Sequence, residues 1–108
     1  MKSVVFLGDS LRRIKSFPRD VRQDFGFQLD AVQRGEAPDN WKPLSDVAKG
    51  VQEIRITDRD GQFRVIFVSR FSSAVYVLHA FQKKSQKTRQ SDIKIARKRF
   101  AEIRELND

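Results

Sequence analysis

The chain has 108 residues, the size of a single domain spanning 1–108, and its mix of 39% hydrophobic and 33% charged residues excludes low-complexity and disordered chains. With no cysteine and one histidine, it lacks the residues for a disulfide framework or a Cys/His metal site, so we expect no metal and no cofactor. No apolar run is long enough for a membrane span or a signal peptide. We therefore expect a cytoplasmic protein without a membrane partner.

The charge is strongly positive and unevenly distributed. Lysine and arginine total 22 against 14 acidic residues, a net charge of +8. Residues 82–99 alone hold eight basic side chains and one acid. A concentrated basic segment favours a polyanionic partner, most often nucleic acid. An acidic protein partner fits the charge equally well, and a solvated helix face that binds nothing is the plainer alternative.

The N-terminal third reads as a strand followed by two helices. The apolar, β-branched run at 3–7 predicts a short strand. A short helix follows, with Asp9 or Ser10 as its cap. A second helix begins near Pro18 and ends at Gly35, which suits a helix C-cap. Four apolar residues at helical spacing form its buried face: Val21, Phe25, Leu29 and Val32.

Residues 35–50 are rich in glycine and proline and are predicted to be a loop, with Trp41 and Leu44 packed against the core. Three strands follow, at 51–57, 62–70 and 74–81, and the first two are joined by an Asp-Gly turn. After a basic loop, a last helix begins with Ser91 as its cap and has an apolar stripe formed by Ile93, Ala96, Phe100 and Ile103. The predicted fold is α+β with the order β-α-α-β-β-β-α and a small, mainly antiparallel sheet whose helices pack on one face.

Alternation along the three central strands separates their side chains into two groups. In one of two registers considered, Arg55 lies directly opposite Arg64, and in either register the same residues share a face. One face is apolar and is expected to lie under helices: Ile54, Ile56, Phe63, Val65, Phe67, Tyr76, Leu78 and Ala80. The other face gathers most of the charge: Glu53, Arg55, Arg64, Ile66, Val68, Arg70, Val77, His79, Phe81 and Lys83.

The second face has the side chains that metal-independent RNA cleavage requires. A carboxylate or a neutral imidazole can accept the proton of a 2′-hydroxyl. Arginine and lysine can stabilise the negative charge of the transition state. His79 is the side chain that titrates near neutrality and can protonate the leaving oxygen. The competing interpretation is structural: Glu53 bridges the two arginines and His79 is a satisfied, half-buried residue.

The sequence also resembles a known family. Three segments carry the resemblance: 50–55 (GVQEIR), 63–67 (FRVIF) and 75–88 (VYVLHAFQKKSQKT). Together with the leading VVFLG run and the Phe17-Pro18 break, they resemble the HigB-like, phage-derived branch of the RelE/ParE toxin superfamily. The block His-x-Phe-x-Lys-Lys at 79–84 is its most specific part. The resemblance implies a RelE-like fold and the toxin of a type II toxin–antitoxin system.

In this family the toxin is an mRNA endonuclease that usually acts on the ribosome and blocks translation. The resemblance therefore implies mRNA and the ribosome as partners, a cognate antitoxin that is a small helix-turn-helix protein, and operator DNA bound indirectly through the antitoxin complex. It places the catalytic residues at Glu53, Arg55, Arg64 and His79, and RNA-binding residues at Lys83, Lys84 and Lys87. Glu53 is the candidate general base, and His79 is a candidate acid, base or site-shaping residue.

Two other functions fit the same resemblance. The superfamily also includes toxins that bind DNA gyrase and have weak nuclease features. A shared fold alone therefore does not decide the activity. A non-catalytic relative would bind only RNA or only its antitoxin. The type of growth arrest separates a block of translation from DNA damage.

Overall fold

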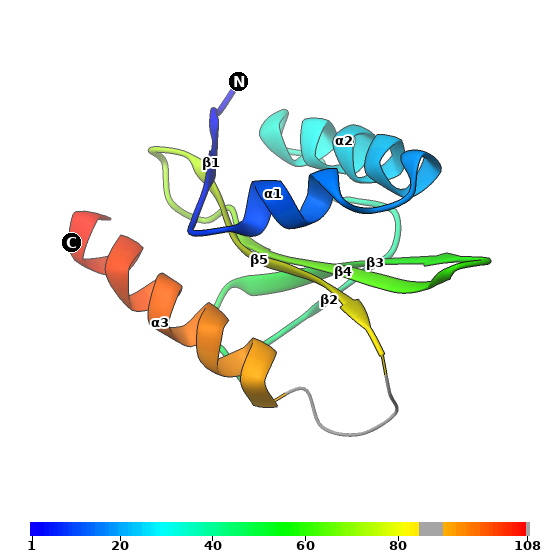
Figure 1. Cartoon of the computed structure of the whole chain (residues 1–108). Coiled ribbons are helices and arrows are strands. Elements are labelled where there is room, and N and C mark those ends of the chain that lie inside the picture. Colours follow the sequence, from blue (N-terminus) through cyan, green and yellow to red (C-terminus); the bar gives the residue numbers. More distant parts are fainter. Residues whose placement is uncertain (85–89, 108) are drawn as a thin grey trace.

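The computed structural model describes residues 1–84 and 90–107, which form one five-stranded sheet and three helices (Figure 1). The elements follow in the order β1 (Val4–Phe6), α1 (Ser10–Lys15), α2 (Arg19–Gln33), β2 (Trp41–Pro43), β3 (Val51–Asp58), β4 (Gly61–Val68), β5 (Val75–Lys83) and α3 (Gln90–Asn107). The sheet order is β1-β5-β4-β3-β2, and only β1 and β5 pair in parallel. The predicted α+β class and the mainly antiparallel sheet are confirmed.

The short strand β2 is the element that the sequence did not predict. It lies in the segment 35–50 that we expected to be a loop, and it pairs antiparallel with β3 at the edge of the sheet. Its three residues include Pro43, which an edge strand tolerates because one of its sides needs no hydrogen bonds. Leu44 is buried as predicted, whereas Trp41 is exposed.

The register of β3 and β4 is the one that places Arg55 directly opposite Arg64. The pairing continues to Asp58 and Gly61, so the turn consists of Arg59 and Asp60. Gly61 has a positive φ of 133°, a conformation that side chains disfavour and that explains the glycine at this position.

A β-bulge in β5 changes which of its side chains share a face. Ile66 pairs with His79, but the next residue of β4, Phe67, pairs with Val77, so Leu78 is the extra residue. As a result Tyr76 and Leu78 pack with Ile66 on the charged side of the sheet, and Val77 packs on the other side. The faces predicted for these three β5 residues were therefore wrong, because strict alternation does not survive a bulge.

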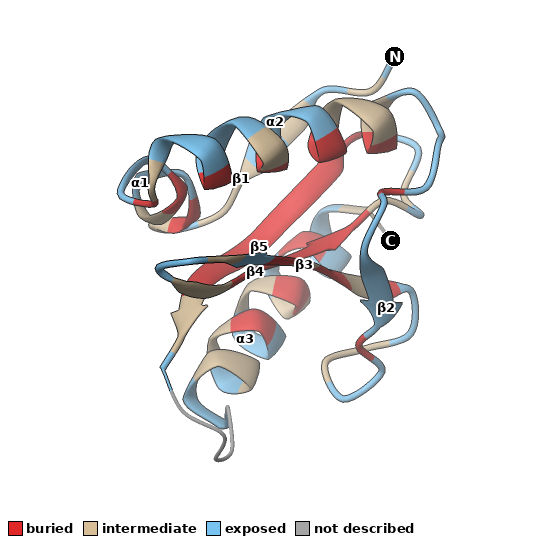
Figure 2. Cartoon of the chain, turned by 90° about the vertical axis from the view of Figure 1, so that its right-hand side faces the viewer, coloured by how far each residue is buried: buried red, intermediate tan, exposed pale blue. Residues whose placement is uncertain are grey.

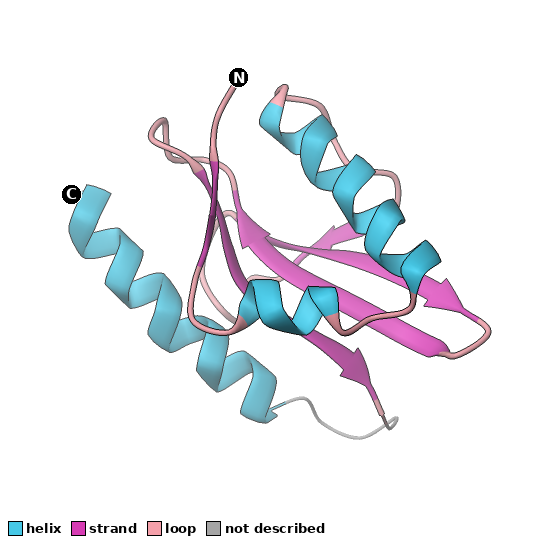
Figure 3. Cartoon of the chain, turned by 45° about the horizontal axis from the view of Figure 1, so that its top comes forward, coloured by secondary structure: helices cyan, strands magenta, loops and turns pink. Residues whose placement is uncertain are grey.

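The helices cover both faces of the sheet, which corrects the prediction that they pack on one face. Helices α1 and α2 lie on one side and α3 lies on the other (Figures 2 and 3). The physical reason is the bulge: Tyr76 and Leu78 join Ile66 and Val68 to form an apolar surface, and α3 buries its stripe against it. The buried residues of that stripe are Ala96, Phe100 and Ile103.

The helix ends agree only in part with their predicted signals. Gly35, with φ of 83°, ends α2 as predicted: its N–H and that of Glu36 bond to carbonyls of the last helical turn. Asp9 stands at the N-cap of α1, but its side chain makes no cap bond and instead accepts from Arg13 and Arg99. Helix α3 includes Ser91, so the predicted cap there was wrong. Within the described residues, no helix is both long and apolar enough to cross a membrane.

Candidate functional site

The charged face of the sheet, defined here by Glu53, Arg55, Arg64, His79 and Lys83, is arranged in cross-strand rows. Glu53 on β3, Ile66 on β4 and His79 on β5 form one row. Arg55, Arg64 and Phe81 form the next row, and Gln62 and Lys83 follow. Directly opposite residues of an antiparallel pair lie on the same side of the sheet, so the predicted site residues of the three strands share one face.

Glu53 lies between two arginines. Its Oε1 is 3.7 Å from Nε of Arg64 and 4.0 Å from Nε of Arg55. Two guanidinium groups on directly opposite residues repel one another, and a carboxylate between them offsets that repulsion. The bridge that the structural interpretation expected is therefore present, and the same bridge fixes both arginines in position.

The three charged side chains differ in their exposure. Glu53 is fully buried and Arg64 is 2% exposed, whereas the side chain of Arg55 is 37% exposed. The guanidinium of Arg64 also donates to the carbonyl of Phe63 at 3.1 Å and to Oε1 of Gln62 at 2.7 Å. Among the arginines of this cluster, Arg55 is therefore the one that a ligand in solvent can reach directly.

His79 is buried and connects the sheet to α3. Its Nε2 donates to a carboxylate oxygen of Asp92 in the first turn of α3, at 2.8 Å, and its ring stacks on Phe81 with the centroids 5.4 Å apart. Within the described residues, Nδ1 has no hydrogen-bond partner. The histidine is more deeply buried than the half-buried residue expected from the sequence, and its contacts fit a residue that positions α3 over the sheet.

Burial lowers the pKa of His79 below its ordinary value of 6.5, although the hydrogen bond to Asp92 acts in the opposite direction. Just below pH 6.5 the imidazole of His79 therefore stays neutral in the folded chain, whereas it takes up a proton in the unfolded chain. The stability contributed by this group is complete above pH 6.5 and is lost as the pH falls below it.

We expect Asp92→Asn to lower the pKa of His79 further, because it removes the carboxylate that raises this pKa. An NMR titration of the imidazole C–H signals measures the effect without ambiguity, since the chain has one histidine. Asp20→Asn, on the far helix α2, is the matched control and should leave the titration unchanged. An unchanged or higher pKa in Asp92→Asn would contradict the contact.

The predicted RNA-binding lysines occupy different places. Lys83 ends β5 on the charged face and is half-buried. Lys84 follows the strand, is exposed, and lines a pocket beside β5 instead of the charged face. Lys87 lies outside the described residues.

Lys42 is a basic residue of this face that the sequence analysis missed. It is exposed and pairs directly opposite Glu53, so β2 extends the positive charge to the other edge of the sheet. No sequence signal could have placed it, because a three-residue strand containing proline has no recognisable alternation. Among residues 1–84 and 90–107, no group of three or more His, Asp or Glu side chains could hold a metal ion.

The comparison with protein families gives a match over most of the chain. Residues 12–101 match the family described as phage-derived protein Gp49-like (DUF891). No curated protein matches the sequence. The match includes α2, the three central strands and most of α3, and with them every residue of the charged face. The chain therefore belongs to the Gp49-like family of phage-derived proteins.

Proposed function

We propose that the protein is the toxin of a type II toxin–antitoxin system and blocks translation by cutting mRNA on the ribosome without a metal ion. The Gp49-like family is associated with toxins of the RelE/HigB type, in agreement with the resemblance of 79–84 to that branch. The observation that carries the proposal is the Arg55–Glu53–Arg64 cluster on a face that also presents Lys42 and Lys83. A small helix-turn-helix antitoxin is the proposed partner.

In this proposal Arg55 and Lys83 contact the phosphate at the scissile bond and stabilise the charge of its transition state. Glu53, which also contacts Arg64, holds the guanidinium of Arg55 beside this phosphate. Such preorganised cations act without moving at the moment of reaction, which is why arginines fixed by a buried carboxylate suit this role. His79 fixes α3 beside the site through Asp92.

A second candidate function is RNA binding without cleavage. One observation favours it: Glu53, Arg64 and His79, three of the four predicted catalytic residues, are at most 2% exposed. Buried groups of this kind do not reach a 2′-hydroxyl or a leaving oxygen without a rearrangement of the chain around them. A protein with this face could still hold an RNA backbone through Arg55, Lys42 and Lys83.

Inducing the chain without its antitoxin should stop growth by blocking translation. Pulse labelling of protein and DNA synthesis, together with mapping of mRNA 5′ ends, measures the effect. We expect protein synthesis to fail first and new 5′ ends to appear within coding regions.

Three other outcomes would each reject the nuclease. Early failure of DNA synthesis with translation intact identifies the gyrase-binding alternative. A translation block without new 5′ ends identifies RNA binding without cleavage. Normal growth, with the folded protein present in cells, excludes a toxin altogether.

A further inference from the structure

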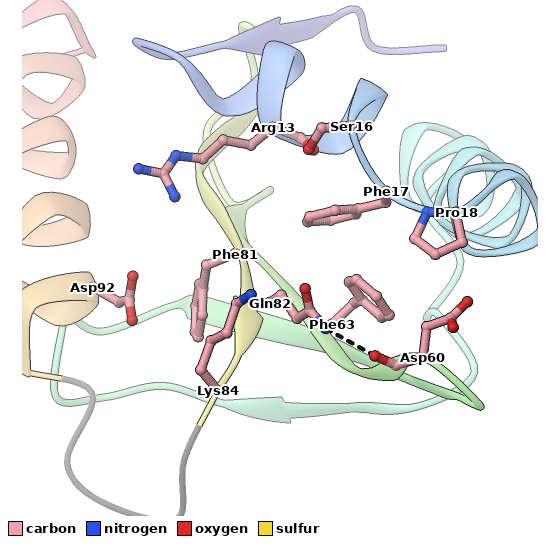
Figure 4. A pocket seen from close by; sticks show the side chains of 10 residues that line it. All are labelled: Arg13, Ser16, Phe17, Pro18, Asp60, Phe63, Phe81, Gln82, Lys84 and Asp92. Carbon is pink, nitrogen blue, oxygen red and sulfur yellow. Dashed lines mark hydrogen bonds between the residues drawn. The ribbon is translucent and has the colours of Figure 1, made fainter.

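The two ends of the charged face differ in their charge. At the end near Lys83, a pocket of about 390 Å³ lies between the corner that joins α1 to α2 and the first turn of α3 (Figure 4). Its lining has two charges of each sign, Arg13 and Lys84 against Asp60 and Asp92. A phosphate there would face two carboxylates, so this end does not favour the continuation of an RNA backbone.

Beyond the opposite end of the charged face, positive charge is in excess. We define the Arg70 patch by three exposed basic residues: Lys49, Arg70 and Arg97. Val68 ends β4 four residues beyond Arg64, about 13 Å along the strand, and Arg70 follows two residues later. In the loop 44–50, which adjoins the patch, Asp46 is the one acid. The patch therefore keeps an excess of positive charge.

The Arg70 patch lies on the same side of the sheet as the charged face. Arg97 belongs to α3, which covers that side, and its Nε donates to the backbone carbonyl of Asp46 at 2.7 Å. The guanidinium of Arg70 lies 5.9 Å from the ring of Phe100, which packs in the core under α3. Along α3, Arg97 lies between Asp92, which contacts the charged face, and Phe100. A molecule that follows this side of the sheet from the charged face therefore reaches Arg97 first and Arg70 next.

The side chain of Arg70 is held in position although it is exposed. Its guanidinium lies over the ring of Phe71, 4.3 Å from the centroid, and this cation–π contact orients the planar group. Its stem packs against Gly50, where an added Cβ would lie 2.6 Å from Cδ of Arg70. Among the described residues, no carboxylate pairs with this guanidinium and no acceptor takes its N–H groups. A fixed guanidinium with uncommitted donors is suited to bidentate binding of a phosphate.

We propose that the Arg70 patch binds the phosphate backbone of the same RNA strand that the charged face holds, beyond the end of that face away from Lys83. Cations that neutralise phosphates release counterions, so the patch adds affinity and salt dependence without reading the bases. Arg70 makes the principal contact, because its guanidinium is oriented before the RNA arrives. This inference rests on the proposed function, since it names a second contact for the same RNA.

Binding of 2′-O-methyl RNA oligomers of two lengths to the purified full-length protein tests the proposal. These oligomers lack the 2′-hydroxyl that the proposed cleavage needs, so they stay intact. One of about 4 nucleotides is chosen to cover the charged face alone, and one of about 12 nucleotides to reach the patch as well. We expect Arg70→Gln to weaken binding of the longer oligomer roughly tenfold, the effect of one charge-assisted contact, and to leave the shorter one unchanged. For the longer oligomer only, the slope of log K against log salt should become shallower by about 0.7.

Arg22→Gln is the matched control, because Arg22 is an exposed arginine of α2 on the other side of the sheet. It should bind both oligomers as the parent protein does. Equal weakening in both variants, or unchanged binding of the longer oligomer by an Arg70→Gln variant that unfolds at the parent temperature, would overturn the inference.

The number of bound oligomers separates one RNA strand from two. The parent protein should bind one short oligomer per chain. Two short oligomers per chain, with one of them lost in Arg70→Gln, would show that the patch binds a separate RNA and would overturn the proposal of a single strand. If the parent protein binds neither oligomer, the proposed function fails and this inference with it.

Discussion

Replacing Arg64 by Met is expected to lower the free energy of unfolding by about 3–5 kcal/mol, because it takes a buried arginine partner away from the buried carboxylate of Glu53. The two atoms are 3.7 Å apart and neither side chain is more than 2% exposed, so water cannot replace the lost partner. Glu53→Met should cost a similar amount, since it takes a buried carboxylate partner away from the buried guanidinium of Arg64. Chemical denaturation of each variant measures both effects.

The double variant Glu53→Met/Arg64→Met separates stability from function. Buried ion pairs that are replaced by apolar side chains of similar size often leave stability unchanged or raise it. We therefore expect the double variant to recover most of the stability that each single variant loses, a coupling that the double-mutant cycle measures. If the pair serves the site by holding Arg55, the stable double variant should not be toxic. Full toxicity in that variant would make the pair a structural feature only.

Arg55→Ala is expected to reduce mRNA cleavage by roughly 10²–10³-fold, the usual cost of removing one preorganised group that stabilises a charged transition state. Its stability should change by less than about 1 kcal/mol, because Arg55 is 37% exposed and its 4.0 Å contact with Glu53 is of the weak, solvent-screened kind. Cleavage of a defined mRNA by the purified protein with ribosomes, beside thermal unfolding, measures the two quantities.

Arg59→Ala is the matched control for this experiment. Arg59 is an exposed arginine in the turn that follows β3, so the variant removes the same charge a few residues away. It should cleave mRNA and unfold as the parent protein does. Equal losses of activity in Arg55→Ala and Arg59→Ala would show that only the total charge matters. Unimpaired cleavage by Arg55→Ala would show that Arg55 is not part of the site.

Periodicity predicted most of the fold because most of its elements have one buried face. The stripe of α2 from Val21 to Val32 is buried as expected, and so are Ala96, Phe100 and Ile103 of α3. The Asp-Gly turn signal limited β3 and β4 to two registers, and the observed one, with Arg59 and Asp60 in the turn, is the register that places Arg55 opposite Arg64. These predictions depend on the spacing of residues that are close together in the chain, and this spacing can be read directly from the sequence.

The remaining features depend on contacts that local spacing does not encode. In the sequence, nothing distinguishes the extra residue Leu78 from other apolar strand residues. The bulge, and the apolar surface on which α3 packs, could therefore not be predicted. Alternation placed Glu53 and His79 on the correct face, but it could not tell that both would be buried. How deeply a side chain is buried depends on which elements pack over its face of the sheet, and those elements are distant in the sequence.

The parallel pairing of β1 with β5 has a consequence for the synthesis of the protein. Val4 pairs with Val75, so β1 must wait for a strand that is synthesised much later in the chain. Contacts between residues so far apart in sequence are slow to form, and the apolar strand 4–6 has no partner until β5 emerges. The sheet that carries the charged face is thus completed only once β5 has been synthesised, and until then its unpaired strand edges remain open to wrong partners.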